Sequence, residues 1–259
     1  MPEHSTWLTL LLAHVRDTLE HNKDALGETL VGHHQPTWAS FEPIAGSLLV
    51  VLIVLAIALR VRARLSNADE AVIPDDRLTL RTFMEAFLAY FYDLAKSVMG
   101  PDRAKKYFPL IGTSAAFIFF SNIMALIPGM PVPTSHLGIT LGCALVVFVL
   151  FNVYGIMSQG MSYFAHLAGP VWWLAPLIFP LEVLSLCIRP VTLAIRLMVN
   201  MAADHVMLAL FLGMVAAFLP LPVMLLGCLV AVVQTLVFTL LACIYVGMAT
   251  EGHDEQHAH

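Results

Sequence analysis

The sequence predicts an all-α polytopic membrane protein with about five transmembrane helices, and two features of its composition carry that prediction. Of the 259 residues, 59% are hydrophobic and only 12% are charged, whereas a soluble domain has about 25% charged residues. The 75 residues from Tyr107 to Leu181 include no Asp, Glu, Lys or Arg. These features exclude a water-soluble enzyme, a nucleic-acid-binding protein and a disordered chain.

Chain length and helix-breaking residues set the number and the bounds of the spans. One span uses about 20 residues, and roughly 180 residues are apolar enough to contribute, so five spans fit in a single membrane domain. Breaks are expected at Arg60, within residues 128–133 (Pro-Gly-Met-Pro-Val-Pro), at Gly169-Pro170 and near Pro220. The predicted spans are residues 43–59, 107–127, 137–159, 172–218 and 223–248.

The distribution of positive charge predicts the orientation. Nine of the 13 Lys and Arg residues lie between Arg60 and Lys106, so the positive-inside rule places this loop in the cytoplasm. Within the loop, residues 78–99 alternate apolar and charged side chains every three or four positions, which is typical of an amphipathic interfacial helix. The predicted parts are therefore an N-terminal segment outside the membrane with a possible amphipathic helix (residues 1–42), the membrane domain (43–250) and a cytoplasmic tail (251–259).

Neither a leader nor a metal or cofactor site is expected. The N-terminus begins with the acidic Glu3 and lacks a basic region, so we expect no cleavable signal peptide. The four cysteines stand singly in apolar runs, without a C-x-x-C pair, and are predicted to be small core residues. Neither His136 nor His166 has a second histidine or a carboxylate at metal-ligand spacing.

The last two predicted spans are too long to stand upright in a bilayer. The 47 residues from Trp172 to Phe218 would extend roughly 70 Å as a continuous helix. The hydrocarbon core is about 30 Å thick. Steep tilt is the simplest way to fit this helix, and we expect the final helix to be inclined beside it.

Only four formally charged residues occur between Tyr107 and Thr250, and all four lie on the penultimate helix: Glu182, Arg189, Arg196 and Asp204. The first three are spaced by seven and so return to nearly the same helix face. A charge at membrane depth costs about 2.5–3.5 kcal/mol or more, so it must face water, a partner charge or a cavity. A polar stripe on an otherwise apolar helix indicates an ion path.

Arg196 is the most informative of these residues, because a guanidinium stays protonated where a lysine would lose its proton. Such a fixed cation attracts a carboxylate and yet does not itself carry the proton. The alternative is a structural ion pair. Glu182 lies about 21 Å from Arg196 along the helix and Asp204 about 12 Å, so neither can pair with it within one straight helix.

Five further polar residues are candidates, each with a plainer alternative. Asn200, one turn beyond Arg196, and Gln234, in the middle of the last helix, could steady a charge or simply hold helices together. Asp204 and His205 are adjacent titratable groups that could relay protons, or could be a solvated and idle pair at the interface. Glu182 could serve the cytoplasmic side, or could be a snorkelling carboxylate at a helix end.

Three stretches resemble subunit a of F-type ATP synthases. The first is residues 180–201, in which a glutamate and a basic-proline pair precede R-L-x-x-N; the others are residues 125–134 and 234–238. The similarity covers most of residues 40–250. This resemblance implies the stator half of a rotary motor in a bacterial plasma membrane. Its partners would be a ring of c subunits, subunit b or other peripheral stalk subunits, and membrane lipids, without nucleic acid.

The resemblance also implies roles for individual residues. Arg196 would separate two aqueous half-channels that carry protons to and from ring carboxylates, with Asn200 and Gln234 as its polar neighbours. Glu182 would belong to the cytoplasmic exit. No ATP-binding loop of the G-x-x-x-x-G-K-[ST] type is present, so the chain is expected to be a non-catalytic, ion-translocating subunit.

The chain departs from the family pattern on the inlet side. His205 stands where some members carry a carboxylate, Gly227 stands where its histidine partner would be, and Ala125 stands where some members carry an acid. Asp204 with His205, or water, must then serve as the inlet. Two rival functions remain open, a proton-coupled secondary transporter and a non-conducting assembly subunit.

Overall fold

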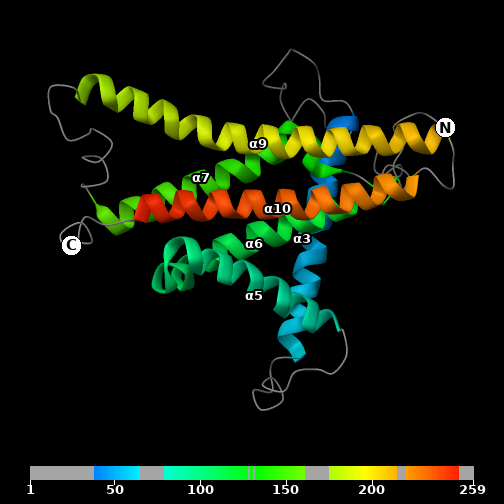
Figure 1. The fold of residues 1–259 in the computed structure, drawn as a ribbon, viewed down its shortest axis with the longest axis horizontal. Coiled ribbons are helices and arrows are strands. Elements are labelled where there is room, and N and C mark those ends of the chain that lie inside the picture. Colours follow the sequence, from blue (N-terminus) through cyan, green and yellow to red (C-terminus); the bar gives the residue numbers. More distant parts are fainter. Residues whose placement is uncertain are drawn as a thin grey trace. The chain divides into compact units, whose positions relative to one another are not determined.

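The fold is helical throughout the part of the chain that the computed structural model describes, which is residues 38–64, 79–127, 129–130, 132–160, 175–214 and 220–250. Five of its helices are long and apolar enough to cross a membrane, which confirms the predicted fold class. Residues 1–37 and the predicted tail 251–259 lie outside the described residues. The elements, shown in Figure 1, are α3 (Trp38–Arg64), α5 (Leu80–Met99), α6 (Pro101–Ala125), the short 3-10 helix η3 (Pro133–Ser135), α7 (Leu137–Gln159), α9 (Ala175–Met214) and α10 (Pro220–Thr250).

Local sequence signals explain how α5 begins and where it gives way to α6. The side chain of Thr79 caps α5 by accepting a hydrogen bond from the backbone N–H of Thr82. Gly100 ends α5 with a φ of 82° and a ψ of 165°, and its N–H donates to the carbonyl of Lys96. Pro101 then starts α6, where a proline costs nothing because the first N–H groups of a helix have no partner within it.

The helix α9 is continuous over 40 residues, although Pro180 and Pro190 lie inside it. Each proline removes one backbone donor from the helical ladder. At 1.5 Å per residue this helix is about 60 Å long, roughly twice the thickness of the hydrocarbon core. The helix α10 has 31 residues. The tilt of these helices in a bilayer, and the limits of each span, stay predictions.

The chain divides into two compact units, and each of the five long helices contributes a segment to both. The first unit holds α3 up to Ala58, residues 117–140, and the segments Leu197–Val232 of α9 and α10. Its interior includes a polar contact, in which the Thr134 hydroxyl donates to Oδ1 of Asn122 at 3.2 Å. Both side chains are fully buried.

The second unit holds α5, the first part of α6, most of α7, α9 up to Arg196 and the end of α10. Aromatic rings join its helices, with the centroids of Tyr107 and Tyr154 4.9 Å apart. At the end of α10 the carbonyl of Ala249 accepts a hydrogen bond of 3.2 Å from Nε2 of Gln159.

Replacing Gly100 with alanine should destabilise the protein by about 1–3 kcal/mol, since its combination of φ and ψ is one that essentially only glycine adopts. Gly142, inside α7, is the matched control, because a Cβ there meets nothing within 4 Å. Gly142→Ala should be neutral or stabilising by up to about 1 kcal/mol, the gain in helix propensity. Thermal unfolding of the two variants in detergent measures the difference, and equal melting temperatures would contradict the account of the α5–α6 junction.

Candidate functional site

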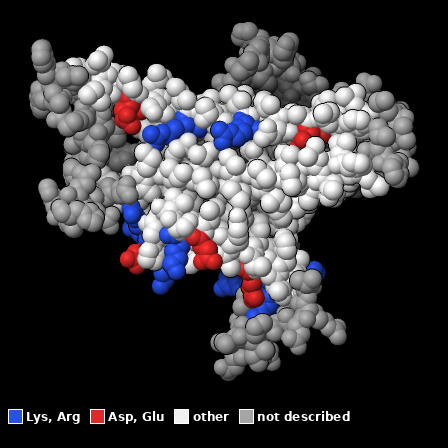
Figure 2. All heavy atoms as spheres, in the orientation of Figure 1, with Lys and Arg blue, Asp and Glu red and all other residues white. Residues whose placement is uncertain are grey.

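Charged side chains lie in a row along α9, and the surface immediately around them is uncharged, whereas a separate group of charges lies lower in the view (Figure 2). Arg196 is exposed, between the exposed side chains of Ile195 (44%) and Val199 (49%). Within the described part of its unit, Arg196 has no hydrogen bond and no ion pair. A permanent cation on an apolar face at membrane depth needs a counter-charge. That counter-charge must come from outside the described residues of this unit.

The other charged residues of this unit on α9 do not supply it. Glu182, Arg189 and Arg196 form no ion pair with one another in the described second unit. Glu182 and Arg189 are both half-buried. The guanidinium carbon of Arg189 lies 5.2 Å from the ring centroid of Tyr245 on α10, which is a cation–π contact. Among its described residues, the charges of α9 therefore do not stabilise this unit through ion pairs.

The two amides named by the sequence differ in their surroundings. Gln234 is only 3% exposed and lies in α10 beside buried Thr235, within the second unit. Asn200 follows Arg196 by one turn of α9 and is half-buried. Both residues make interactions within the protein, so the adhesive and the charge-steadying interpretations both stay open for them.

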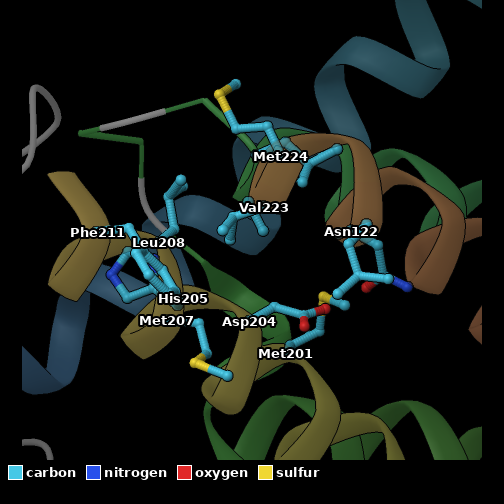
Figure 3. A pocket seen from close by; sticks show the side chains of 13 residues that line it. Asn122, Met201, Asp204, His205, Met207, Leu208, Phe211, Val223 and Met224 are labelled. Atoms are coloured by element: carbon cyan, nitrogen blue, oxygen red, sulfur yellow. The ribbon is translucent and has the colours of Figure 1, made fainter. Parts of the chain in front are cut away.

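A cavity of about 150 Å³ lies in the first unit, lined by residues of α6, α9 and α10. It has room for several water molecules, each of which occupies about 30 Å³ in the liquid. Asp204 and His205 both line it, and they are the titratable residues among its walls. In the view of Figure 3, Asp204 lies between His205 and Asn122 along the wall of the cavity. The structure thus places the two predicted inlet residues, Asp204 and His205, in the wall of one cavity that is large enough for water.

The cavity presents buried polar atoms that the protein does not satisfy. Oδ2 of Asp204 and Nδ2 of Asn122 are buried, and neither has a hydrogen-bond partner among the described residues. Leaving a buried polar atom unpaired costs about 1–3 kcal/mol. A water molecule that bonds to these atoms in the cavity would remove this cost. The arrangement therefore suits a hydrated carboxylate that can take up and release protons.

Asn122 is a cavity residue that the sequence analysis missed. It is 1% exposed, and its Oδ1 accepts the hydrogen bond from Thr134. One signal was available, because Asn122 is the only amide side chain in the otherwise uncharged run 107–127. An amide held within a membrane span is costly unless it is paired or hydrated.

Gly227 also lines this cavity, from α10. A Cβ at this position would lie 2.7 Å from Cδ2 of Leu126, closer than real Cβ atoms approach other atoms. The glycine therefore lets α10 come close to the end of α6. Gly227 offers no side chain to pair with His205, and its position is instead a point of close helix packing.

No metal site accompanies these residues in the described part of the chain, where no group of three His, Cys, Asp or Glu side chains could hold an ion. The chemistry available to the cavity is proton uptake and release by a carboxylate and an imidazole, and hydrogen bonding through water.

This fold and these residues define a class, the polytopic helical membrane proteins that carry ionisable groups within their spans. A family model described as ATP synthase A chain matches residues 44–247. The chain belongs to this family.

Individual relatives agree with the family model. The chain is 58% identical to ATP synthase subunit a of Sorangium cellulosum over 254 residues, which cover 98% of this chain and 99% of the relative. It is 44% identical to ATP synthase subunit a 1 of Syntrophotalea carbinolica, over 78% of this chain and 83% of the relative. It is 41% identical to ATP synthase subunit a of Geobacter sulfurreducens, over 67% of this chain and 76% of the relative.

The close approach at Gly227 predicts a coupled pair of substitutions. Gly227→Ala adds up to about 1 kcal/mol of helix propensity but meets Cδ2 of Leu126, so this side chain must shift and part or all of that gain is offset. The same change made in a Leu126→Ala background should be stabilising, because the clash is gone. A double-mutant cycle by thermal unfolding measures this coupling. Additive effects of the two substitutions would show that the helices do not touch there.

Proposed function

We propose that this chain is the stator subunit of the membrane sector of a rotary ATP synthase, and that it carries protons to and from carboxylates on a ring of c subunits. Its family membership and the name of its relatives, ATP synthase subunit a, support a place in this complex. The observation that carries the mechanism is the exposed guanidinium of Arg196 on α9, which has no hydrogen bond and no ion pair among the described residues of its unit.

Arg196 separates the entry and exit of protons by simple electrostatics. A ring carboxylate beside this fixed cation is favoured in its ionised form, so it cannot keep a proton while it passes. Once protonated by the inlet, the carboxylate is neutral and can travel through lipid on the rotor. The same cation repels hydrated cations that would otherwise leak directly across.

The two half-channels lie at opposite ends of the charged stretch of α9. Asp204 and His205, with the water-sized cavity beside them, form the inlet on the outer side. Glu182 lies fourteen residues toward the other end and belongs to the cytoplasmic exit. Asn200 and Gln234 are the polar neighbours that steady the arginine. A membrane potential of 100 mV supplies about 2.3 kcal/mol for each charge that crosses.

The remaining assignments follow from this arrangement. The chain is a multi-pass protein of the bacterial plasma membrane, with the N-terminus outside and the C-terminus in the cytoplasm. It contacts the c-ring through α9 and α10, and subunit b or other peripheral stalk subunits through other helices. It catalyses no reaction alone, and the energy of proton flow reaches ATP only through its partner subunits.

Arg196→Ala tests this proposal in the assembled complex. Proton-driven ATP synthesis should fall below detection, because nothing then forces ring carboxylates to release their protons, while the amount of complex in the membrane stays unchanged. Lysine is the matched control for charge alone, and Arg196→Lys should remain strongly impaired because an ammonium can surrender its proton. Loss of the complex itself, with coupling retained in what survives, would favour an assembly subunit. Uptake of a solute driven by protons would favour a transporter.

Asp204→Asn tests the inlet. Passive proton conduction through the membrane sector should fall at least about tenfold, because a positioned proton carrier contributes that much or more to a proton-transfer step. Asp93 on α5 is exposed and offers a matched loss of one carboxylate, so Asp93→Asn should conduct at the wild-type rate. If Asp204→Asn conducted equally well, the inlet would have to run through other groups.

A further inference from the structure

The two arginines of α9 are placed differently, although they share a helix face. Arg189 and Arg196 are seven residues apart, so they return to nearly the same side of the helix. Arg196 is exposed and has no partner within the described second unit, whereas Arg189 is half-buried. The guanidinium carbon of Arg189 lies 5.2 Å from the ring centroid of Tyr245. The side chain of Arg189 is therefore drawn toward α10.

The ring of Tyr245, which contacts Arg189, itself packs against α7. The centroid of Tyr245 lies 6.0 Å from that of Phe151 on α7. Phe151 is 2% exposed and makes an edge-to-face contact with Phe148 at 5.2 Å. This aromatic stack fixes the face that Tyr245 presents to α9. The contact with Arg189 is thus backed by a buried core and is not a chance approach of two surface side chains.

We propose that Tyr245 is a positioning residue that withdraws the guanidinium of Arg189 from the rotor-facing surface of α9, so that Arg196 alone presents a cation to the ring carboxylates. This inference rests on the proposed function. The side chain of Ile188, next to Arg189, is 49% exposed, so a released Arg189 has open surface on which to extend. Two competing cations two helical turns apart would then hold ring carboxylates ionised in two places. Each carboxylate would have to leave two cations instead of one, and the rotor would turn more slowly.

The test uses ring-less variants of Tyr245 in the assembled complex, reconstituted in vesicles, with ATP-driven proton pumping as the readout. Tyr245→Met keeps a packing partner for Phe151 but cannot hold a cation by its ring. Pumping per complex should fall about two- to fivefold, the factor that matches the free energy of one exposed cation–π contact. Tyr245→Phe keeps the ring and should pump at nearly the wild-type rate.

The decisive result is suppression. Arg189→Gln alone should have little effect, because Arg189 carries no proton in the proposed mechanism. The double variant Tyr245→Met with Arg189→Gln should recover the rate of Arg189→Gln, since no second cation is left to release. A merely structural role for the contact predicts the opposite, that the double variant remains as slow as Tyr245→Met.

Each remaining outcome also decides the question. Wild-type pumping by Tyr245→Met, or equal loss in Tyr245→Phe, overturns the inference. Failure of both Tyr245→Met and Tyr245→Leu to assemble, with or without Arg189→Gln, shows a structural role and overturns it as well. Arg196→Ala in the same vesicles separates failure of the proposed function from failure of this inference. If Arg196→Ala pumps normally, the proposed function fails. If Arg196→Ala is inactive and the double variant shows no suppression, this inference alone is refuted.

Discussion

A permanent positive charge on an apolar helix face is the constraint on which the rest of this protein depends. The guanidinium of Arg196 cannot be neutralised by losing its proton, and at membrane depth it is costly without a counter-charge. The described residues of its unit supply none. In the proposed function, the carboxylates of the c-ring bring negative charge to this face, one after another and reversibly.

The same helix shows how a second cation is treated when it has no such task. Arg189 is held over an aromatic ring, which lowers the cost of its charge without offering a carboxylate. A carboxylate there would form a fixed ion pair that only strengthens the fold. The contrast between a cation satisfied inside the protein and one left open to a partner is more informative than the presence of charge alone. The two arginines lie seven residues apart, or about 10.5 Å along the helix at about 1.5 Å for each residue.

Much of the fold could be predicted from the sequence, because hydropathy and charge are local properties. Five apolar helices follow from long uncharged runs, and the charges of α9 stand out because 75 residues before them have none. The site could be predicted only along single helices. Asn122 lies in α6 and Gly227 in α10, and no periodicity tells that they line one cavity. The contact of Arg189 with Tyr245 joins residues 56 positions apart for the same reason. Such pairings are set by the packing of helices, which composition and spacing do not encode.

The cavity supports the proposed inlet, although Gly227 offers no side-chain partner there. Gly227 brings α10 close to Leu126 and offers no hydrogen-bonding group of its own. The neighbouring space is large enough for water, and Oδ2 of Asp204 borders it without a partner among the described residues. Water both donates and accepts hydrogen bonds, so it can connect a carboxylate to the outside over a distance that one side chain would have to match closely. A carboxylate beside a cavity that holds water would therefore tolerate variation in its surroundings, provided that the space stays open. The proposed inlet would therefore depend on the volume of this cavity as much as on the identity of its titratable groups.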